Sequence, residues 1–392
     1  MTNLPQGWEV KTIEEVCKNS SSNLALKDIK DKNGDYPVFG ASGIVGYVDF
    51  YHKDKECLSI VKDGAGVGRV FVLPKNSSVI GTLNYLENFE NTNLKYLFYF
   101  LHSIDFSKYI LGSAIPHIYF RDYKKEQIPL PPLKEQERIV GILDFAFSKI
   151  DENIKKAKEN LANIDELMQS ALQKAFNPLN DNTKENYQLP QSWEWKSLGD
   201  VANIKGGKRL PKNEKLLEHN TSFVYIRVAD FQDNGTINLK SIKFINENTY
   251  NILKNYKIYD DNLYISIAGT IGKSGIIPKE LNGAILTENA VKLEYIIDNI
   301  LNRYMYFFTI SNIFKAQAEV STKIVAQPKL AITRLKQIQI PLPPLQEQEQ
   351  IAKHLDFVFE KAKALKELYT KELKDYEELK QSLLDKAFKG EL

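Results

Sequence analysis

The chain is poor in the residues that build metal sites and disulfide frameworks. It holds two cysteines, Cys17 and Cys57, and five histidines among 392 residues. The cysteines lie forty residues apart and the histidines show no ligand spacing, so neither a disulfide framework nor a metal site is predicted. The longest apolar runs, at 96–101 and 304–308, fall far short of the roughly 20 residues that cross a bilayer. With the polar opening MTNLPQGWEV, these features predict no secretion signal and a protein of the reducing cytoplasm.

Signatures of nucleotide chemistry are also missing. The string GTIGKSG at 269–275 resembles a phosphate-binding loop, but that motif would need glycine where Ile267 stands. The glycines of KDGAGVGRV at 62–70 lack the dinucleotide-binding spacing and precede a predicted strand instead of a helix. A turn between strands explains them. No self-contained catalytic signature remains, so we expect a chain that is not itself an enzyme.

The formal net charge is only +2, yet the charge is unevenly distributed. Residues 178–339 hold 21 basic and 16 acidic side chains, a local excess of five positive charges. The densest basic segment is KGGKRLPKNEK at 205–215. Such a segment could bind phosphates through release of counterions, and a solvated loop is an equally good interpretation of the charge alone.

The chain repeats itself in two places. IPLPPLKEQERI at 128–139 returns as IPLPPLQEQEQI at 340–351, and 24 of the 50 positions from Ile128 and from Ile340 are identical at a constant offset of 212. LPQGWEV at 4–10 returns as LPQSWEW at 189–195, at an offset of 185. A period near 200 is too long for a solenoid, so it indicates a duplicated domain-plus-connector unit with approximate twofold symmetry.

A long helix should follow each PLPP segment. Proline is tolerated in the first helical turn, and the following residues are rich in Glu, Lys, Leu and Ala. Apolar residues recur at alternating spacings of four and three, which predicts a coiled-coil seam. The predicted seam comprises Leu143, Phe147, Ile150, Ile154, Leu161 and Ile164 in the first helix and Leu355, Phe359, Leu373 and Leu383 in the second. Lys366 and Lys380 occupy two seam positions, where Leu365 and Leu379 are expected to supply the apolar contacts.

The remaining segments, 1–127 and 178–339, are predicted to be mixed lobes. Short runs such as YPVFG and LYISIAG alternate with Gly, Asn and Asp turns, which is typical of strands. One aromatic helix is expected near the end of each lobe, around 94–104 and 301–313. The predicted fold class is therefore α+β, with two mixed lobes at 1–127 and 178–339 and two long helices at 128–177 and 340–392 that can bury their seams only against each other or a partner.

Glycine turns with polar tips recur in both lobes, and such turns let backbone and short side chains approach DNA closely. Arg and Lys suit guanine, and Asn or Gln suits adenine. The candidate contacts in the first lobe are Ser42, Lys62, Arg69, Ser113, His117, Tyr119 and Arg121. Those in the second are Lys205, Lys208, Arg209, Arg227, Thr270, Lys273, Ser274, Lys323 and Gln327. Ordinary hairpin loops are the alternative interpretation of any one of these turns.

The two Leu-Pro-x-x-Trp-Glu openings, the two IPLPPLxEQExI corners before long helices and the ending KAFKGEL resemble the specificity subunit of type I restriction-modification systems. The resemblance spans Leu4 to Leu392. It implies two target-recognition domains that each read one half of an interrupted double-stranded DNA sequence. The resemblance further implies that the two long helices pair as an antiparallel coiled coil and hold these domains apart. It also implies docking of two adenine-methylating modification subunits and, in the full complex, two nuclease subunits. S-adenosylmethionine, ATP and magnesium would then belong to those partners, with no cofactor in this chain.

Two consequences follow from the resemblance. The helix pair would act as a ruler that sets the separation of the half-sites. Because the lobes hardly resemble each other between their signatures, the target should be non-palindromic. The alternative function is a coiled-coil scaffold whose lobes bind protein surfaces, and a steep salt dependence of binding would separate DNA recognition from it.

Overall fold

The protein is described by a computed structural model covering residues 4–29, 33–112, 115–179, 189–320 and 329–392. The chain divides into two compact units. Unit 1 comprises residues 1–159 and 369–392, and unit 2 comprises residues 160–368. Each unit therefore contains one lobe and one end of both long helices, α4 (Leu133–Phe176) and α10 (Leu345–Lys389). In the described residues, no helix is both long and apolar enough to cross a membrane.

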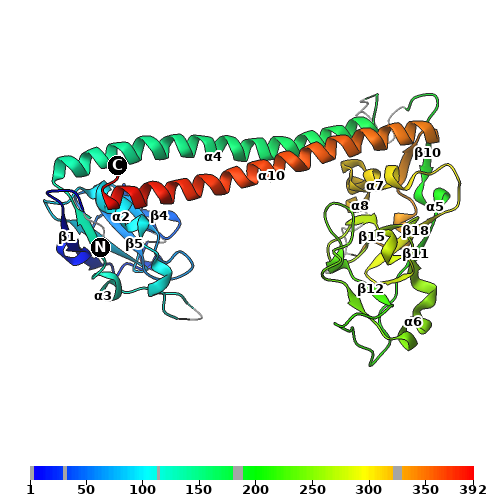
Figure 1. The fold of residues 1–392 in the computed structure, drawn as a ribbon, viewed down its shortest axis with the longest axis horizontal. Coiled ribbons are helices and arrows are strands. Elements are labelled where there is room, and N and C mark those ends of the chain that lie inside the picture. The colour runs from blue at the N-terminus through cyan, green and yellow to red at the C-terminus, as the bar shows by residue number, and fades with distance from the viewer. Residues whose placement is uncertain (1–3, 30–32, 113–114, 180–188, 321–328) are drawn as a thin grey trace. The chain divides into compact units, whose positions relative to one another are not determined.

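The described residues of the unit 1 lobe form three small sheets (Figure 1). A four-stranded antiparallel sheet has the order β2-β8-β5-β6, a three-stranded sheet the order β4-β3-β7, and β1 pairs with β9. The strands are β1 Glu9–Thr12, β2 Cys17–Ser21, β3 Tyr36–Gly40, β4 Gly43–Val48, β5 Cys57–Val61, β6 Val70–Leu73, β7 Ser78–Val79, β8 Leu83–Asn88 and β9 Gln127–Leu130. The helices are α1 Ile13–Val16, α2 Leu94–Ser103 and α3 Phe120–Tyr123.

The described residues of the unit 2 lobe also form three sheets, but the second sheet has four strands where that of unit 1 has three. Two of these sheets have the orders β11-β18-β15-β16 and β13-β12-β17-β14, and β10 pairs with β19. The strands are β10 Glu194–Ser197, β11 Ala202–Gly206, β12 Val224–Ile226, β13 Lys243–Phe244, β14 Lys257–Ile258, β15 Leu263–Ser266, β16 Ser274–Ile276, β17 Ala284–Leu286, β18 Ala290–Tyr295 and β19 Gln339–Leu342. The helices are α5 Leu198–Val201, α6 Glu247–Leu253, α7 Asn302–Ile310, α8 Asn312–Val320 and α9 Ile332–Leu335. The mixed α+β lobes predicted from the sequence are confirmed.

The two sequence signatures of each half meet in a two-stranded ribbon. Glu9 of the Trp-Glu signature lies opposite Leu130 of the PLPP corner, and Glu194 lies opposite Leu342 in the second half. The aromatic helix of each lobe fastens this ribbon, because Tyr96 donates a hydrogen bond to the carbonyl of Pro129 at 2.6 Å. Tyr304 does the same to Pro341. The two motifs therefore form one joint between lobe and helix.

The glutamine of the EQE motif stabilises each joint through three hydrogen bonds to the backbone. Gln136 is fully buried, its Oε1 accepts from the Asn93 N–H at 2.7 Å, and its Nε2 donates to the carbonyls of Asn91 and Pro131. Gln348 repeats the pattern with the Leu301 N–H and the carbonyls of Asn299 and Pro343. Because a buried polar group without a partner is costly, the same amide is retained in both halves.

Replacing Gln136 by Leu is expected to destabilise unit 1 by about 2–4 kcal/mol, because it leaves one N–H and two carbonyls without their partner. Chemical denaturation followed by circular dichroism measures this loss. Glu137→Gln, at the exposed neighbouring position, serves as the control and should change stability by less than about 0.5 kcal/mol. Equal stability of the Gln136→Leu variant and the wild type would contradict the role given to this amide.

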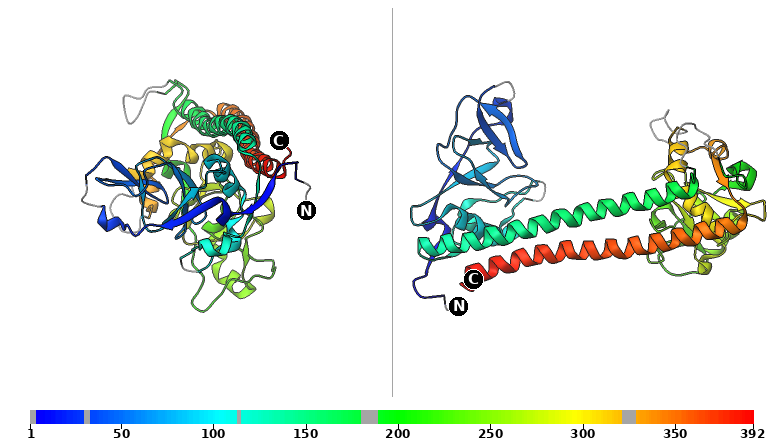
Figure 2. Two further views of the ribbon diagram at one scale, coloured as in Figure 1. Left: turned by 90° about the vertical axis from the view of Figure 1, so that its left-hand side faces the viewer. Right: turned by 90° about the horizontal axis from the view of Figure 1, so that it is seen from above.

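The long helices pair antiparallel within each unit (Figures 1 and 2). In unit 1 Lys380 forms an ion pair with Asp151 at 2.6 Å, and in unit 2 Lys366 forms one with Asp165. Every predicted seam residue is buried or half-buried. Leu365 and Leu379 are exposed, so the expectation that they supply the seam contacts is wrong. Lys366 and Lys380 are tolerated in the seam because each forms an ion pair with an aspartate of the opposite helix.

The last turns of each long helix pack in the hydrophobic core of a lobe. Leu172 and Phe176, at the end of α4, are fully buried in the core of unit 2. Leu384 and Phe388 of α10, 212 residues later, lie in the core of unit 1. The chain then turns at Gly390, whose φ of +74° suits glycine and where a Cβ would lie 2.5 Å from the ring of Pro5. The last residues thus lie against the first described ones in unit 1 (Figure 2).

Candidate nucleic-acid interface

Three loops of the first lobe come together. His117 pairs with both Asp63 and Leu111 in isolated bridges, and the Gly64 N–H donates to the Pro116 carbonyl at 2.8 Å. A Cβ on Gly66 would lie 3.4 Å from the side chain of Ala41, so the β3–β4 turn adjoins the same place. These contacts gather segments 39–47, 62–69, 111–112 and 115–121 on one part of the lobe.

The polar tips of this first-lobe cluster are accessible. Ser42, Arg69, Tyr119 and Arg121 are exposed, whereas Lys62 and His117 are half-buried. The Arg121 guanidinium lies 4.5 Å from the centre of the Tyr119 ring, and the His117 ring meets Tyr119 edge-on at 5.0 Å. An aromatic ring flanked by a guanidinium and an imidazole offers stacking and hydrogen-bond donors to a base or a phosphate. Ser113 lies outside the described residues.

The second lobe forms a pocket of about 690 Å³ at its most basic segment. Its lining includes Lys208, Arg209 and Lys329 together with the acid Glu288. The Lys329 end of the wall is held to the sheet by a bridge to Ala268. The nearby Thr270 is exposed, and half-buried Lys273 forms an ion pair with Asp233 at 2.8 Å.

Glu288 stays ionised in this pocket. Burial alone would raise its pKa, but the hydrogen bonds that Glu288 accepts, chiefly from Arg209, outweigh burial and lower the pKa below its usual value. The Nε of Arg209 lies 2.7 Å from Glu288 Oε1. Glu288 is not among the residues that the sequence predicted to contact DNA. The signal that could have found it is an acid in the turn ILTENAV at 285–291, between two apolar strands.

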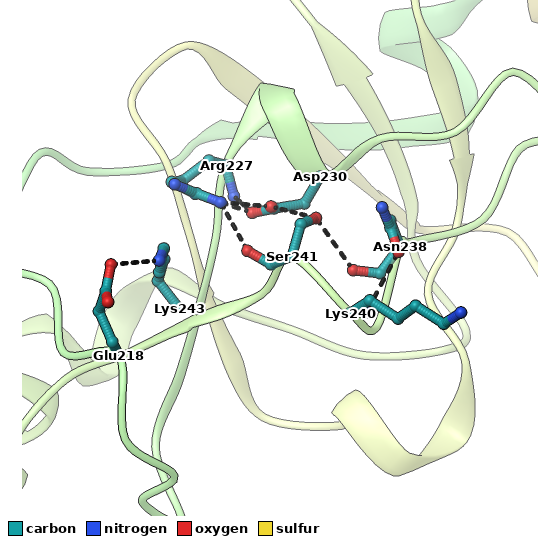
Figure 3. Close-up of polar contacts among 7 residues, drawn as sticks. All are labelled: Glu218, Arg227, Asp230, Asn238, Lys240, Ser241 and Lys243. Atoms are coloured by element: carbon teal, nitrogen blue, oxygen red, sulfur yellow. Dashed lines mark hydrogen bonds and ion pairs between the residues drawn. The ribbon is translucent and has the colours of Figure 1, made fainter.

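Two predicted contacts have structural roles instead. Ser274 is buried, and its hydroxyl bonds that of Thr309 at 2.7 Å, so it cannot reach a ligand at the surface. Arg227 clamps fully buried Asp230 through Nε at 3.0 Å and an Nη at 2.6 Å, and it also donates to the Ser241 carbonyl (Figure 3). We therefore withdraw Ser274 and Arg227 from the predicted DNA contacts.

Lys205 and Lys208 lie at the surface of the second lobe. Lys205 is exposed on β11 and forms an ion pair with Glu294 at 2.5 Å. Lys208 is exposed beside Arg209, with its ammonium 5.8 Å from the centre of the Tyr256 ring. Lys323 and Gln327 lie outside the described residues. Among the described residues, the cations that line the pocket are Lys208, Arg209 and Lys329.

Comparison with known proteins identifies the family. The type I restriction modification DNA specificity domain matches residues 5–163 and 190–374, once in each half. The chain belongs to this family. Two matches in one chain agree with the internal repeat, and the coiled-coil scaffold alternative is not favoured.

Relatives in the family are distant in sequence. The type I restriction enzyme EcoBI specificity subunit of Escherichia coli is 25% identical over 292 residues, which cover 71% of this chain and 61% of that subunit. The MjaVIII specificity subunit of Methanocaldococcus jannaschii is 24% identical over 416 residues, covering 99% of this chain and 94% of that one.

Solved structures in the family share the fold. A chain from a structure of the complex assembly of a type I restriction-modification system has a TM-score of 0.77 at 21% identity, and the match covers 100% of both chains. The HsdS subunit of Thermoanaerobacter tengcongensis has a TM-score of 0.55 at 20% identity and covers 99% of this chain and 98% of that one. At these identities the likeness concerns the architecture of two lobes and long helices.

Proposed function

We propose that this chain is the DNA-recognition subunit of a type I restriction-modification complex, and that each lobe reads one half of an interrupted, non-palindromic target. The observation that carries the proposal is the family match in both halves, combined with lobes whose frames agree and whose loops differ. The first lobe offers the Arg69, Tyr119 and Arg121 cluster, and the second offers the Lys208 and Arg209 pocket. Different loop chemistry on a common frame suits the reading of different bases.

The catalytic work belongs to partner subunits in this proposal. Adenine methylation with S-adenosylmethionine, and DNA cleavage with ATP and magnesium, would be carried out by the modification and nuclease subunits in the cytoplasm. Burial supports an inert role for both thiols of this chain, since it raises the pKa of Cys17 and of Cys57 to about 12.

The long helices supply surfaces for two copies of the modification subunit. Leu133, Phe145 and Leu167 of α4 recur 212 residues later as Leu345, Phe357 and Leu379 of α10, and all six side chains are exposed. Phe145 and Phe357 are 69% and 59% exposed. A single exposed apolar residue is common on a protein surface, so exposure alone identifies no interaction site. Their recurrence at the repeat offset supports one kind of partner that binds twice.

Exchange of one lobe tests the proposed function. Replacing residues 1–127 with the lobe of another family member should change one half of the methylated sequence and leave the other half and the gap unchanged. Mapping methylated adenines in DNA from cells that produce the hybrid with its modification subunit measures this. The reciprocal exchange of residues 178–339 is the matched control and should change only the other half. A hybrid that alters both halves, or neither, would contradict the proposal.

A further inference from the structure

The Arg209–Glu288 pair combines donors and an acceptor in one fixed arrangement. Arg209 is exposed over 79% of its side chain, whereas Glu288 is exposed over 26%. Glu288 is held from behind, because its Oε2 accepts from the Thr287 hydroxyl at 3.0 Å and lies 3.4 Å from the Tyr225 hydroxyl. The ion pair uses the Nε–H of Arg209, and a guanidinium carries further N–H donors on its two terminal nitrogens.

The backbone fixes where these two side chains stand. The Gly207 N–H donates to the Ala290 carbonyl and the Lys208 N–H to the Leu286 carbonyl, both at 2.9 Å. A Cβ on Gly207 would lie 2.1 Å from the Thr287 carbonyl oxygen, so only glycine permits this close crossing. The segment that carries Arg209 is therefore bound directly to the β17–β18 turn that carries Glu288.

The first lobe carries no charged pair at the matching positions. Counted from the paired strands β2–β8 and β11–β18, Leu24 and Gly81 occupy the positions of Arg209 and Glu288. The Gly81 N–H donates to the Leu24 carbonyl at 2.7 Å, and the Leu24 side chain is buried. The charged pair is therefore not required by the fold and distinguishes the second lobe.

We propose that Arg209 and Glu288 together read one G·C base pair in the half-site of the second lobe. In the major groove guanine presents the acceptors O6 and N7, and cytosine presents the N4 amino donor. The terminal nitrogens of Arg209 donate to guanine while the Glu288 carboxylate accepts from cytosine. An A·T pair presents adenine N7 and N6–H₂ together with thymine O4, so neither base offers Arg209 two acceptors side by side and the bidentate contact is lost. This inference rests on the proposed function and adds Glu288 as a specificity-determining residue.

Selection from a library of randomised DNA duplexes tests the inference, using the full chain assembled with its modification subunit. The wild type should enrich G·C at one position of the second half-site. Glu288→Gln should lower that preference roughly 5- to 100-fold and leave the other positions unchanged. Arg209→Gln should relax the same position. Because Arg209 is highly exposed, this variant keeps the test valid if Glu288→Gln lowers the stability of the lobe.

Glu218→Gln is the matched control in the same lobe. Glu218 forms an exposed ion pair with Lys243 (Figure 3) at 2.9 Å, and its loss should leave every position of the motif unchanged. The inference is overturned if Glu288→Gln tightens binding without changing the preference, since Glu288 would then only neutralise Arg209. It is also overturned if the two variants alter different positions. A wild-type complex that enriches no sequence would instead contradict the proposed function itself.

Discussion

Insertion of seven residues into both long helices is expected to lengthen the gap between the half-sites and to leave both half-sites unchanged. Seven helical residues add about 10.5 Å, which corresponds to about three base pairs of duplex. A full heptad restores the seam on both sides of the insertion. The insertions belong after Ala157 in α4 and after Lys374 in α10, because the ion pairs of Asp151 and Asp165 place these residues opposite each other. Mapping methylated adenines measures the gap.

The control for the heptad variant is a seven-residue insertion in an exposed loop of the first lobe, between Asp54 and Lys55. This change lengthens the chain equally and should leave the gap unaltered. If the helix variant methylated the original spacing, the helices would not set it.

Reversal of a seam charge is expected to have the second large effect. Lys380→Glu would place a carboxylate against Asp151 at a position where the lysine side chain is only 23% exposed. Loss of a buried ion pair costs about 3–5 kcal/mol and loss of an exposed one less than about 1 kcal/mol, so this half-buried pair should lose about 1–3 kcal/mol of stability. Chemical denaturation of the full chain measures the loss.

Restoring the opposite charge should recover the stability. The double variant Lys380→Glu with Asp151→Lys is expected to regain most of the loss, and a double-mutant cycle gives the coupling. Lys374→Glu, on the exposed face of α10, should cost only about 0.3–0.5 kcal/mol by facing Glu378 in the same helix. If the swap variant were as unstable as the single variant, the ion pair would not link the helices at this position.

The sequence predicted the long helices well because their signals are local and repeated. Proline at the start and apolar positions in heptad spacing specify α4 without knowledge of anything that it contacts. The aromatic helix expected at 301–313 also forms, but it breaks at Ser311. The backbone of Ser311 is extended, and its Oγ accepts from the Phe314 N–H at 3.3 Å, which starts α8. A buried serine cap of this kind depends on packing around it.

The candidate interface was less predictable, because the fate of a polar loop residue depends on its tertiary neighbours. Ser274 and Arg227 are polar loop residues of the kind that contacts DNA. In the structure, however, Ser274 hydrogen-bonds to Thr309 and Arg227 to Asp230 inside the lobe. Glu288 has no motif of its own and acquires its place only through the crossing at Gly207. The seam lysines show the same dependence, since Asp151 and Asp165 on the other helix decide whether they are tolerated.

The most direct test of the account is a map of methylated adenines in DNA from cells that produce the wild-type chain with its modification subunit. The account predicts one motif made of two different short sequences separated by a gap of fixed length. A continuous motif, a palindromic one or a gap that varies from site to site would contradict it.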